Sequence, residues 1–154
     1  NVVTRARDQI LTALALHPCG TVWKTISASI HDITASDKDI ALQTLVNERL
    51  VSVILDTGIE ENLIKLVPIE DQEKVKALSN DEFLIYSYIE NAGTEGVIFL
   101  NMRRSISINL TSIKKSMKHL IQLEVIKPFK PVQGQKKCYI LFRLTPGQHK
   151  TPMR

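Results

Sequence analysis

The sequence has few of the residues that build catalytic and metal sites. It contains two cysteines, six glycines and four histidines in 154 residues. The glycines form no Gly-x-Gly-x-x-Gly and no phosphate-binding loop, and no histidine lies beside a Ser or Cys in a nucleophile motif. Glu60-Glu61 and Asp81-Glu82 are better explained as turn and helix-cap residues than as an acid–base pair. The sequence therefore predicts no enzyme, no cofactor and no metal site.

The two cysteines and the apolar runs exclude further classes. Cys19 and Cys138 form no Cys-x-x-Cys pair. Two buried reduced thiols, as in a reducing compartment, are favoured over a disulfide or metal ligation, because zinc needs about four closely spaced ligands. No apolar run approaches the roughly 20 residues of a membrane span, and no secretory signal pattern is present. The chain starts at Asn1 rather than Met, which favours a fragment or a processed product.

The sequence does have a strongly uneven charge distribution. Residues 1–67 carry six Lys/Arg and eight Asp/Glu, a net charge of −2, and residues 68–78 carry two and three, a net charge of −1. Residues 79–154 carry twelve Lys/Arg and five Asp/Glu, a net charge of +7. The three segments together give the total of +4. A length of 154 residues favours one domain. The asymmetry instead predicts two, of which only the second binds a polyanion.

The apolar pattern repeats at an offset of 75 positions. Gly20 also aligns with Gly96 after one further position. The order of these matches indicates a duplicated module. The aligned apolar pairs are Ile10 and Ile85, Leu14 and Ile89, Leu42 and Met117, Leu45 and Leu120, Val46 and Ile121, and Leu50 and Val125.

The second copy predicts three helices followed by two strands. Ser79 and Glu82 form a capping box, which starts a helix that ends at Ala92-Gly93. Residues 97–99 are expected to be extended, residues 100–105 to form a short helix, and Asn109 or Thr111 to cap a third helix. Strands are expected over 125–130 and 138–144, and Pro128, Pro131 and Gly134 are expected to bound the connection between them. The apolar positions of the third helix are Ile113, Met117, Leu120, Ile121 and Val125.

The first copy predicts the same order. Helices are expected over 5–16 and 22–30, and Ser36 is expected to cap a third helix with Asp39 at the capping-box position. A hairpin is expected from strands 51–55 and 63–67 around Asp56-Thr57-Gly58. Three helices followed by a hairpin form a winged helix. We predict an α+β fold of two tandem winged helices, over 1–67 and 79–146, with a linker over 68–78 and a tail over 147–154.

The third helix of the second module predicts a nucleic-acid contact. Its outward residues are expected to be Lys114, Lys115, Lys118 and Gln122, and the alternative is an ordinary solvated surface. Lysine suits backbone phosphate better than base edges, so the contact is expected to be independent of sequence. Arg103 and Arg104 flank the second helix, and the wing adds Lys127, Lys130, Lys136, Lys137 and Arg143.

The first module differs at the matched positions. It has Asp39 in place of Lys114 and Gln43 in place of Lys118, and it is expected either to bind protein or to act as a spacer. Trp23 is interpreted as a core residue, with a partner anchor as the alternative. His119 is interpreted as a surface or boundary residue, with a DNA or protein contact as the alternative.

Two stretches of the second module resemble one known family. Residues 78–97, LSNDEFLIYSYIENAGTEGV, resemble the second winged helix of the tandem winged-helix initiation subunit of RNA polymerase III, which is related to the small subunit of transcription factor IIE. Residues 127–132, KPFKPV, and 136–146, KKCYILFRLTP, agree with the family pattern of a basic pair before a strand that closes on Pro. The family usually has Trp where this chain has Ile98.

The resemblance implies a non-catalytic polymerase subunit of the nucleus. It implies that the subunit lies with two partner subunits over the cleft, helps to hold and open double-stranded promoter DNA, and contacts the promoter-bound initiation factor. Two other classes stay open. A free-standing winged-helix regulator would bind a palindrome as a homodimer, and a tandem winged-helix scaffold would bind no DNA and need no +7 module.

Overall fold

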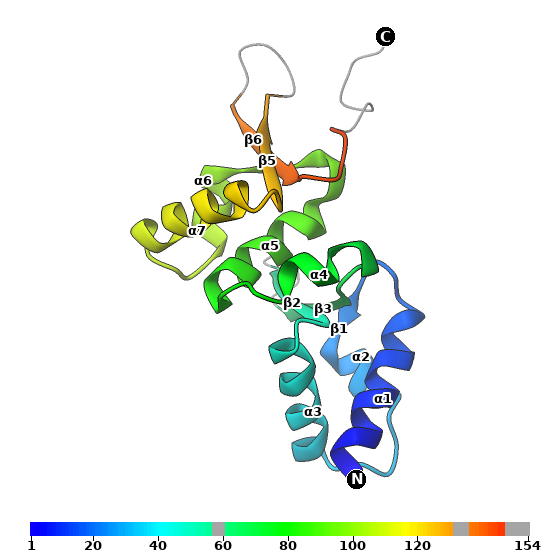
Figure 1. The fold of residues 1–154 in the computed structure, drawn as a ribbon. Coiled ribbons are helices and arrows are strands. Elements are labelled where there is room, and N and C mark those ends of the chain that lie inside the picture. The colour runs from blue at the N-terminus through cyan, green and yellow to red at the C-terminus, as the bar shows by residue number, and fades with distance from the viewer. Residues whose placement is uncertain (57–60, 131–135, 147–154) are drawn as a thin grey trace. The chain divides into compact units, whose positions relative to one another are not determined.

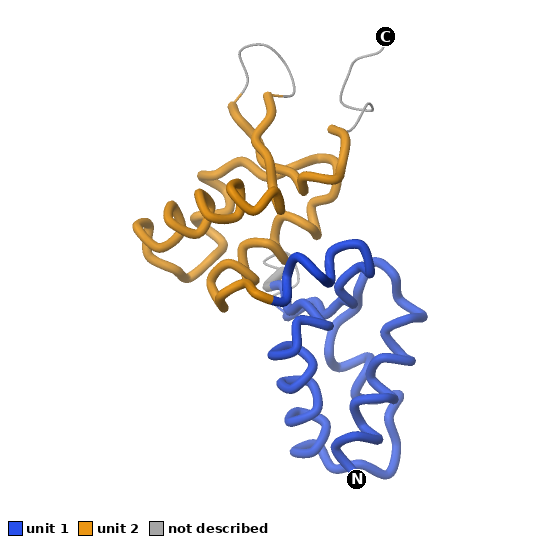
Figure 2. The backbone as a smooth tube through the Cα atoms, in the orientation of Figure 1, with its two compact units in different colours: residues 1–76 blue, residues 77–154 orange. Residues whose placement is uncertain are grey.

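The computed structural model of the protein describes residues 1–56, 61–130 and 136–146 (Figure 1). The chain divides into two compact units, residues 1–76 and 77–154 (Figure 2). Each unit combines helices with one antiparallel three-stranded sheet, so the predicted α+β class is confirmed. The predicted turn residues Thr57, Gly58, Pro131 and Gly134 and the tail over 147–154 lie outside the described residues.

Unit 1 contains three helices and a sheet of strand order β1-β3-β2. The helices are α1 (Val2–Ala15), α2 (Trp23–Ala28) and α3 (Ala35–Asn47), and the strands are β1 (Thr21–Val22), β2 (Val51–Asp56) and β3 (Glu61–Leu66). The helix predicted over 22–30 is shorter at both ends, from Trp23 to Ala28. Val22 is extended because β1 pairs with β3, in the register Thr21 to Ile64 and Val22 to Leu63.

Side-chain caps set where α1 and α3 begin. The Asn1 side chain accepts a hydrogen bond from the Thr4 N–H at 2.9 Å, which starts α1. The Thr34 hydroxyl accepts one from the Asp37 N–H at 3.1 Å, which starts α3. The prediction that Ser36 caps this helix was therefore wrong, because Thr34 has the extended backbone that an N-cap requires.

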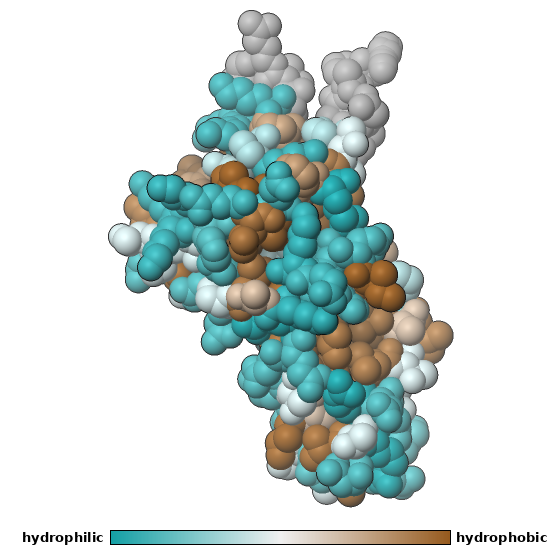
Figure 3. Space-filling model, viewed as in Figure 1, coloured by the Kyte–Doolittle hydropathy of each residue, from teal (hydrophilic) through white to brown (hydrophobic). Residues whose placement is uncertain are grey.

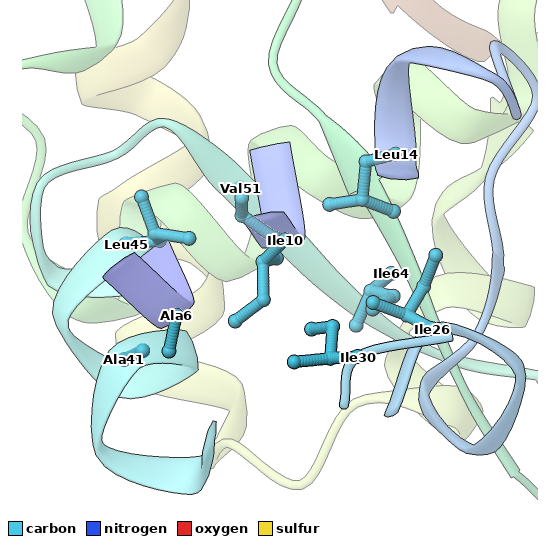
Figure 4. Close-up of a cluster of buried hydrophobic side chains, with 9 residues drawn as sticks. All are labelled: Ala6, Ile10, Leu14, Ile26, Ile30, Ala41, Leu45, Val51 and Ile64. Carbon is cyan, nitrogen blue, oxygen red and sulfur yellow. The ribbon is translucent and has the colours of Figure 1, made fainter. Parts of the chain in front are cut away.

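The core of unit 1 lies between its three helices and the sheet (Figure 4). Residues four apart on α1 point into it, which is the periodicity of an amphipathic helix. Ile10 and Leu14, two landmarks of the repeat, are fully buried there. The buried cluster consists of Ala6, Ile10, Leu14, Ile26, Ile30, Ala41, Leu45, Val51 and Ile64.

Unit 2 repeats this order with a sheet of strand order β4-β6-β5. Its helices are α5 (Asn80–Ala92), η2 (Gly93–Glu95), α6 (Phe99–Ser105) and α7 (Leu110–Gln122), and its strands are β4 (Val97–Ile98), β5 (Ile126–Phe129) and β6 (Cys138–Leu141). Phe99 belongs to the helix rather than to the extended stretch. The last strand ends earlier than predicted because Phe142 and Arg143 form a turn.

The predicted caps of α5 and α7 in unit 2 are confirmed. Ser79 and Glu82 form both hydrogen bonds of the capping box at the start of α5. Of the two candidate caps of α7, Asn109 is the cap, and its side chain accepts from the Ser112 N–H at 2.8 Å. These caps satisfy amide donors that have no partner within the helix.

The repeat extends to the backbone at the ends of α3 and α7. Arg49 has φ of 63° and Glu124 has φ of 59°, and the two residues are 75 positions apart. After each, an amide bonds back across the helix end at 3.0 Å, from Leu50 to the Leu45 carbonyl and from Val125 to the Leu120 carbonyl. Both helices thus end in the same left-handed turn, usually occupied by Gly.

The predicted linker residues fold as short helices. They form η1 (Ile69–Asp71) and α4 (Gln72–Val75), and Val75 and Leu78 are buried. The exact domain limits within the 68–78 segment stay a prediction.

The cysteine prediction was partly wrong. Both thiols are free, but only Cys138 is buried, since Cys19 lies exposed in the turn after α1. No helix within the described ranges has the length and apolar character to cross a bilayer. The same residues contain no group of three His, Cys, Asp or Glu side chains arranged to hold a metal ion.

Candidate nucleic-acid interface

Helix α7 presents one buried face and one exposed cationic face. Ile113, Met117 and Leu120 are buried, as their spacing predicts. The four residues predicted to point outward are all exposed: Lys114, Lys115, Lys118 and Gln122. In the view of Figure 3, hydrophilic surface covers much of both units and separates smaller apolar patches.

A side-chain contact joins α7 to α5. Nδ1 of His119 lies 2.5 Å from Oε2 of Glu82, the capping-box residue of α5. Partial burial raises the pKa of Glu82, but hydrogen bonds with Ser79 and His119 outweigh it and hold that pKa below its ordinary value. His119 is thus half-exposed and paired within the unit, in line with the surface interpretation.

The other predicted cations stand on two further elements. Arg103 and Arg104 are exposed in the last turn of α6, where the negative end of the helix dipole favours positive charge. Lys136 and Lys137 are exposed immediately before β6. Among the residues that the structure describes, none of these four forms a salt bridge with an acidic side chain. Their charges are therefore available to an external anion.

Lys127 is less available than the sequence suggests. It is half-buried, and its ammonium nitrogen lies 5.5 Å from the centroid of the Phe142 ring. A cation over an aromatic ring is attracted to the electrons of that ring. Lys127 therefore packs against Phe142 in the wing.

A groove runs along the same face of α7. It has a volume of about 500 Å³ and brings Lys114 and Lys118 together with apolar side chains. Sequence reasoning missed Ile121 as a surface residue; it is 38% exposed. Helical spacing could have shown its exposure, because Ile121 lies on the same helix face as Lys114 and Lys118, at i+7 from Lys114. The groove is lined by Phe99, Lys114, Met117, Lys118, Ile121, Gln122 and Tyr139.

The matched face of α3 has no lysine at these positions. Asp39, Ile40 and Gln43 are exposed where α7 has Lys114, Lys115 and Lys118. Ile40 is 48% exposed, and sequence reasoning missed it. An exposed aliphatic side chain beside polar ones is more typical of a protein contact than of a phosphate contact.

The strand register shows that the two units also differ in charge at matched positions beside their hairpin strands. Val51 pairs with Leu66 in one sheet, and Ile126 pairs with Leu141 in the other, so the offset of 75 holds through both hairpins. Lys136 and Lys137 therefore match Glu61 and Asn62.

Part of the negative charge counted for unit 1 is neutralised within it. Arg7 forms a salt bridge with Glu48 at 2.6 Å, which joins α1 to the end of α3. Asp39 makes no comparable pair with a described basic residue. The available negative charge on α3 therefore centres on its first half.

Unit 1 has a groove of its own beside α2. Its volume is about 530 Å³, and it includes half-buried Trp23. The Lys38 ammonium group donates to the Ser27 carbonyl at 2.7 Å, so this lysine joins α3 to α2. Trp23 thus contributes to both the core and the surface.

Comparison with known proteins identifies the family. The sequence model described as "RNA polymerase Rpc34 subunit" matches residues 1–151. The chain belongs to this family. The resemblance stated from residues 78–97 and 127–146 is confirmed.

Three relatives show how far the similarity extends, each named "DNA-directed RNA polymerase III subunit RPC6". The Homo sapiens protein is 29% identical over 146 residues, which are 94% of this chain and 45% of the relative. The Drosophila melanogaster protein is 27% identical over 150 residues, which are 94% of this chain and 50% of the relative. The Dictyostelium discoideum protein is 31% identical over 137 residues, which are 88% of this chain and 46% of the relative. The chain spans about half the length of these relatives.

Proposed function

We propose that this chain is part of a non-catalytic subunit of nuclear RNA polymerase III that acts in transcription initiation. The family membership and the names of the relatives support the assignment to the polymerase. The charge and burial of α3 and α7 support a division of labour. In this proposal unit 2 contacts promoter DNA and unit 1 contacts protein.

One observation carries the DNA assignment. Three exposed lysines of α7, Lys114, Lys115 and Lys118, stand where the equivalent helix of the same fold has Asp39, Ile40 and Gln43. A general need for solubility would not place lysine on only one of two matched faces. Duplex DNA carries one negative charge per ~1.7 Å of axis, so it attracts the first face and not the second.

The contact is to backbone phosphate, with little sequence preference. Lysine is a flexible point charge, whereas bidentate base reading uses Arg, Asn or Gln. Contact of this kind suits a factor that helps to hold and open many promoters. The proposed DNA-binding residues are Arg103, Arg104, Lys114, Lys115, Lys118, Lys136 and Lys137.

Unit 1 supplies the protein contact through α3. Asp39 and Gln43 are the proposed contact residues, and exposed Ile40 between them adds the apolar area that protein interfaces bury. The proposed partners are the neighbouring polymerase subunits and the promoter-bound initiation factor.

The test uses the full chain and a labelled DNA duplex. Binding is measured by fluorescence anisotropy across a salt series for the wild type, Lys114→Ala with Lys118→Ala, and the matched control Asp39→Ala with Gln43→Ala. Neutralising ~3–5 phosphates gives a log–log salt slope of about −3 to −4.5. Each lysine change is expected to reduce that slope by about 1, and the α3 control is expected to leave it unchanged.

Two results would contradict the DNA assignment. Equal loss in both double variants would show that α7 has no special part in DNA binding. A strong preference for one duplex sequence would indicate base reading rather than phosphate contact.

A further inference from the structure

The groove along α7 has an apolar floor that DNA phosphate contact does not explain. Four of its seven lining residues are apolar: Phe99, Met117, Ile121 and Tyr139. A phosphate backbone needs cations and hydrogen-bond donors, not aliphatic surface. The volume of about 500 Å³ is in the range of sites that bind apolar groups of a ligand.

The rim of the groove carries charge of one sign. Lys114 and Lys118 lie one turn apart on α7, Gln122 continues the same row, and no carboxylate is among the lining residues. The ligand that complements such a site is anionic at its edges and apolar at its centre. Lys114, Lys118 and Gln122 have the spacing i, i+4, i+8, so an elongated ligand that lies along the helix can contact all three.

We propose that this groove binds an acidic segment of a partner protein through one or two bulky apolar side chains. The apolar side chains enter between Ile121 and the rings of Phe99 and Tyr139, and flanking carboxylates meet Lys114 and Lys118. Met117 suits such a floor because its unbranched side chain adapts to different apolar partners. This goes beyond the proposed function, because it places a second ligand on a face already assigned to DNA.

A protein segment fits the floor better than a nucleic-acid base does. A base of a duplex reaches the groove only after leaving its stack and its partner base, which costs free energy. A flexible segment presents an apolar side chain without that cost, and aliphatic Met117 and Ile121 offer it a matching surface. Because both ligands use Lys114 and Lys118, they are expected to exclude each other.

The experiment compares two labelled peptides on the full chain. One is a run of Asp and Glu around a central Phe-Leu pair, and the other has Ala at both central positions with the same net charge. Burial of the two side chains is expected to make the first peptide bind the wild type about tenfold more tightly or better. Unlabelled duplex DNA is expected to displace it.

Two variants locate the contact. Ile121→Ser is expected to remove the advantage of the Phe-Leu peptide and to leave the Ala peptide unchanged. Leu123→Ser is the matched control, since Leu123 is 42% exposed near the end of the same helix and does not line the groove. Duplex affinity is measured in parallel, and its dependence on Lys114 and Lys118 tests the proposed function separately.

Several outcomes would overturn the proposal. Equal affinity of the two peptides for the wild type would show attraction by charge alone, and this comparison does not depend on any variant folding. An advantage that survives Ile121→Ser would place the site elsewhere. Tighter binding of single-stranded oligothymidine than of duplex, lost in Ile121→Ser, would show that the groove takes bases.

Discussion

Glu82 and His119 join the start of α5 to the last turns of α7, with Oε2 and Nδ1 2.5 Å apart. The Glu82 side chain is only 12% exposed and also accepts the Ser79 N–H at 3.0 Å. One carboxylate therefore caps one helix and anchors the helix that carries the candidate DNA-binding lysines.

We expect this link to make stability depend on pH in the acid range. The pKa of Glu82 lies below its ordinary value in the folded state, so its stabilising effect is present above the ordinary pKa and is lost as pH falls through the lowered one. Glu82→Gln keeps the capping-box geometry but loses the charge. Thermal unfolding across pH is expected to show a deficit for Glu82→Gln at neutral pH that shrinks on acidification.

Glu82→Ala is the companion variant, because it removes the hydrogen bond from the Ser79 N–H as well as the pair with His119. Loss of that hydrogen bond is expected to cost about 0.5–1.5 kcal/mol of unfolding free energy, so Glu82→Ala is expected to cost more than Glu82→Gln. Identical pH profiles for the wild type and Glu82→Gln would show that the carboxylate charge has no part in stability.

The two faces of α7 are expected to respond differently to truncation. Met117→Ala is expected to cost roughly 2–5 kcal/mol, because Met117 is 5% exposed and its removal leaves a cavity. Lys114→Ala with Lys118→Ala is expected to change stability by only about ±0.5 kcal/mol, because both side chains are exposed. Chemical denaturation of the three proteins measures this, and loss of the cooperative transition in the lysine variant would reverse the assignment of the faces.

The protein-binding role of unit 1 predicts the result of a charge exchange. Asp39→Lys with Gln43→Lys gives α3 the charges of α7 at the matched positions. It is expected to weaken co-purification with the polymerase subunits and the initiation factor, and to raise affinity for duplex DNA. If every partner stays bound at the wild-type level, and truncation of the unit also has no effect, unit 1 is only a spacer.

The shared helix end makes a prediction about backbone conformation. Glu124 has φ of 59°, which costs a side chain with Cβ about 1–2 kcal/mol and costs Gly almost nothing. Glu124→Gly is therefore expected to be more stable than Glu124→Ala by about 1 kcal/mol, although both lose the Glu side chain. Arg49→Gly and Arg49→Ala repeat the comparison in unit 1, and equal stabilities at both sites would contradict it.

Local signals predicted the parts of the fold that depend on neighbouring residues. The Ser79 capping box, the cap of α7 at one of its two candidates, Asn109, and the burial of Ile113, Met117 and Leu120 were correct, because each rests on spacing within one helix. The choice of Ser36 over Thr34 as a cap was wrong. Both residue types suit an N-cap, and only the backbone conformation distinguishes them.

Features that depend on residues far apart in the sequence could not be predicted from local patterns. The strand β1 has two residues, too few for an alternation pattern, and it exists because β3 is beside it. Ile121 looked like a core residue because apolar spacing cannot tell a buried row from the floor of a groove.

The sequence by itself determined the duplicated order of elements, the family, and which module carries the positive charge. These properties depend on composition and on spacing along the chain, which folding does not change. Only the tertiary structure decided that Lys114 and Lys118 share a groove with Phe99 and Tyr139, and that His119 is joined to Glu82. Those relationships bring together residues up to about 40 positions apart, and packing of the helices and the sheet fixes them.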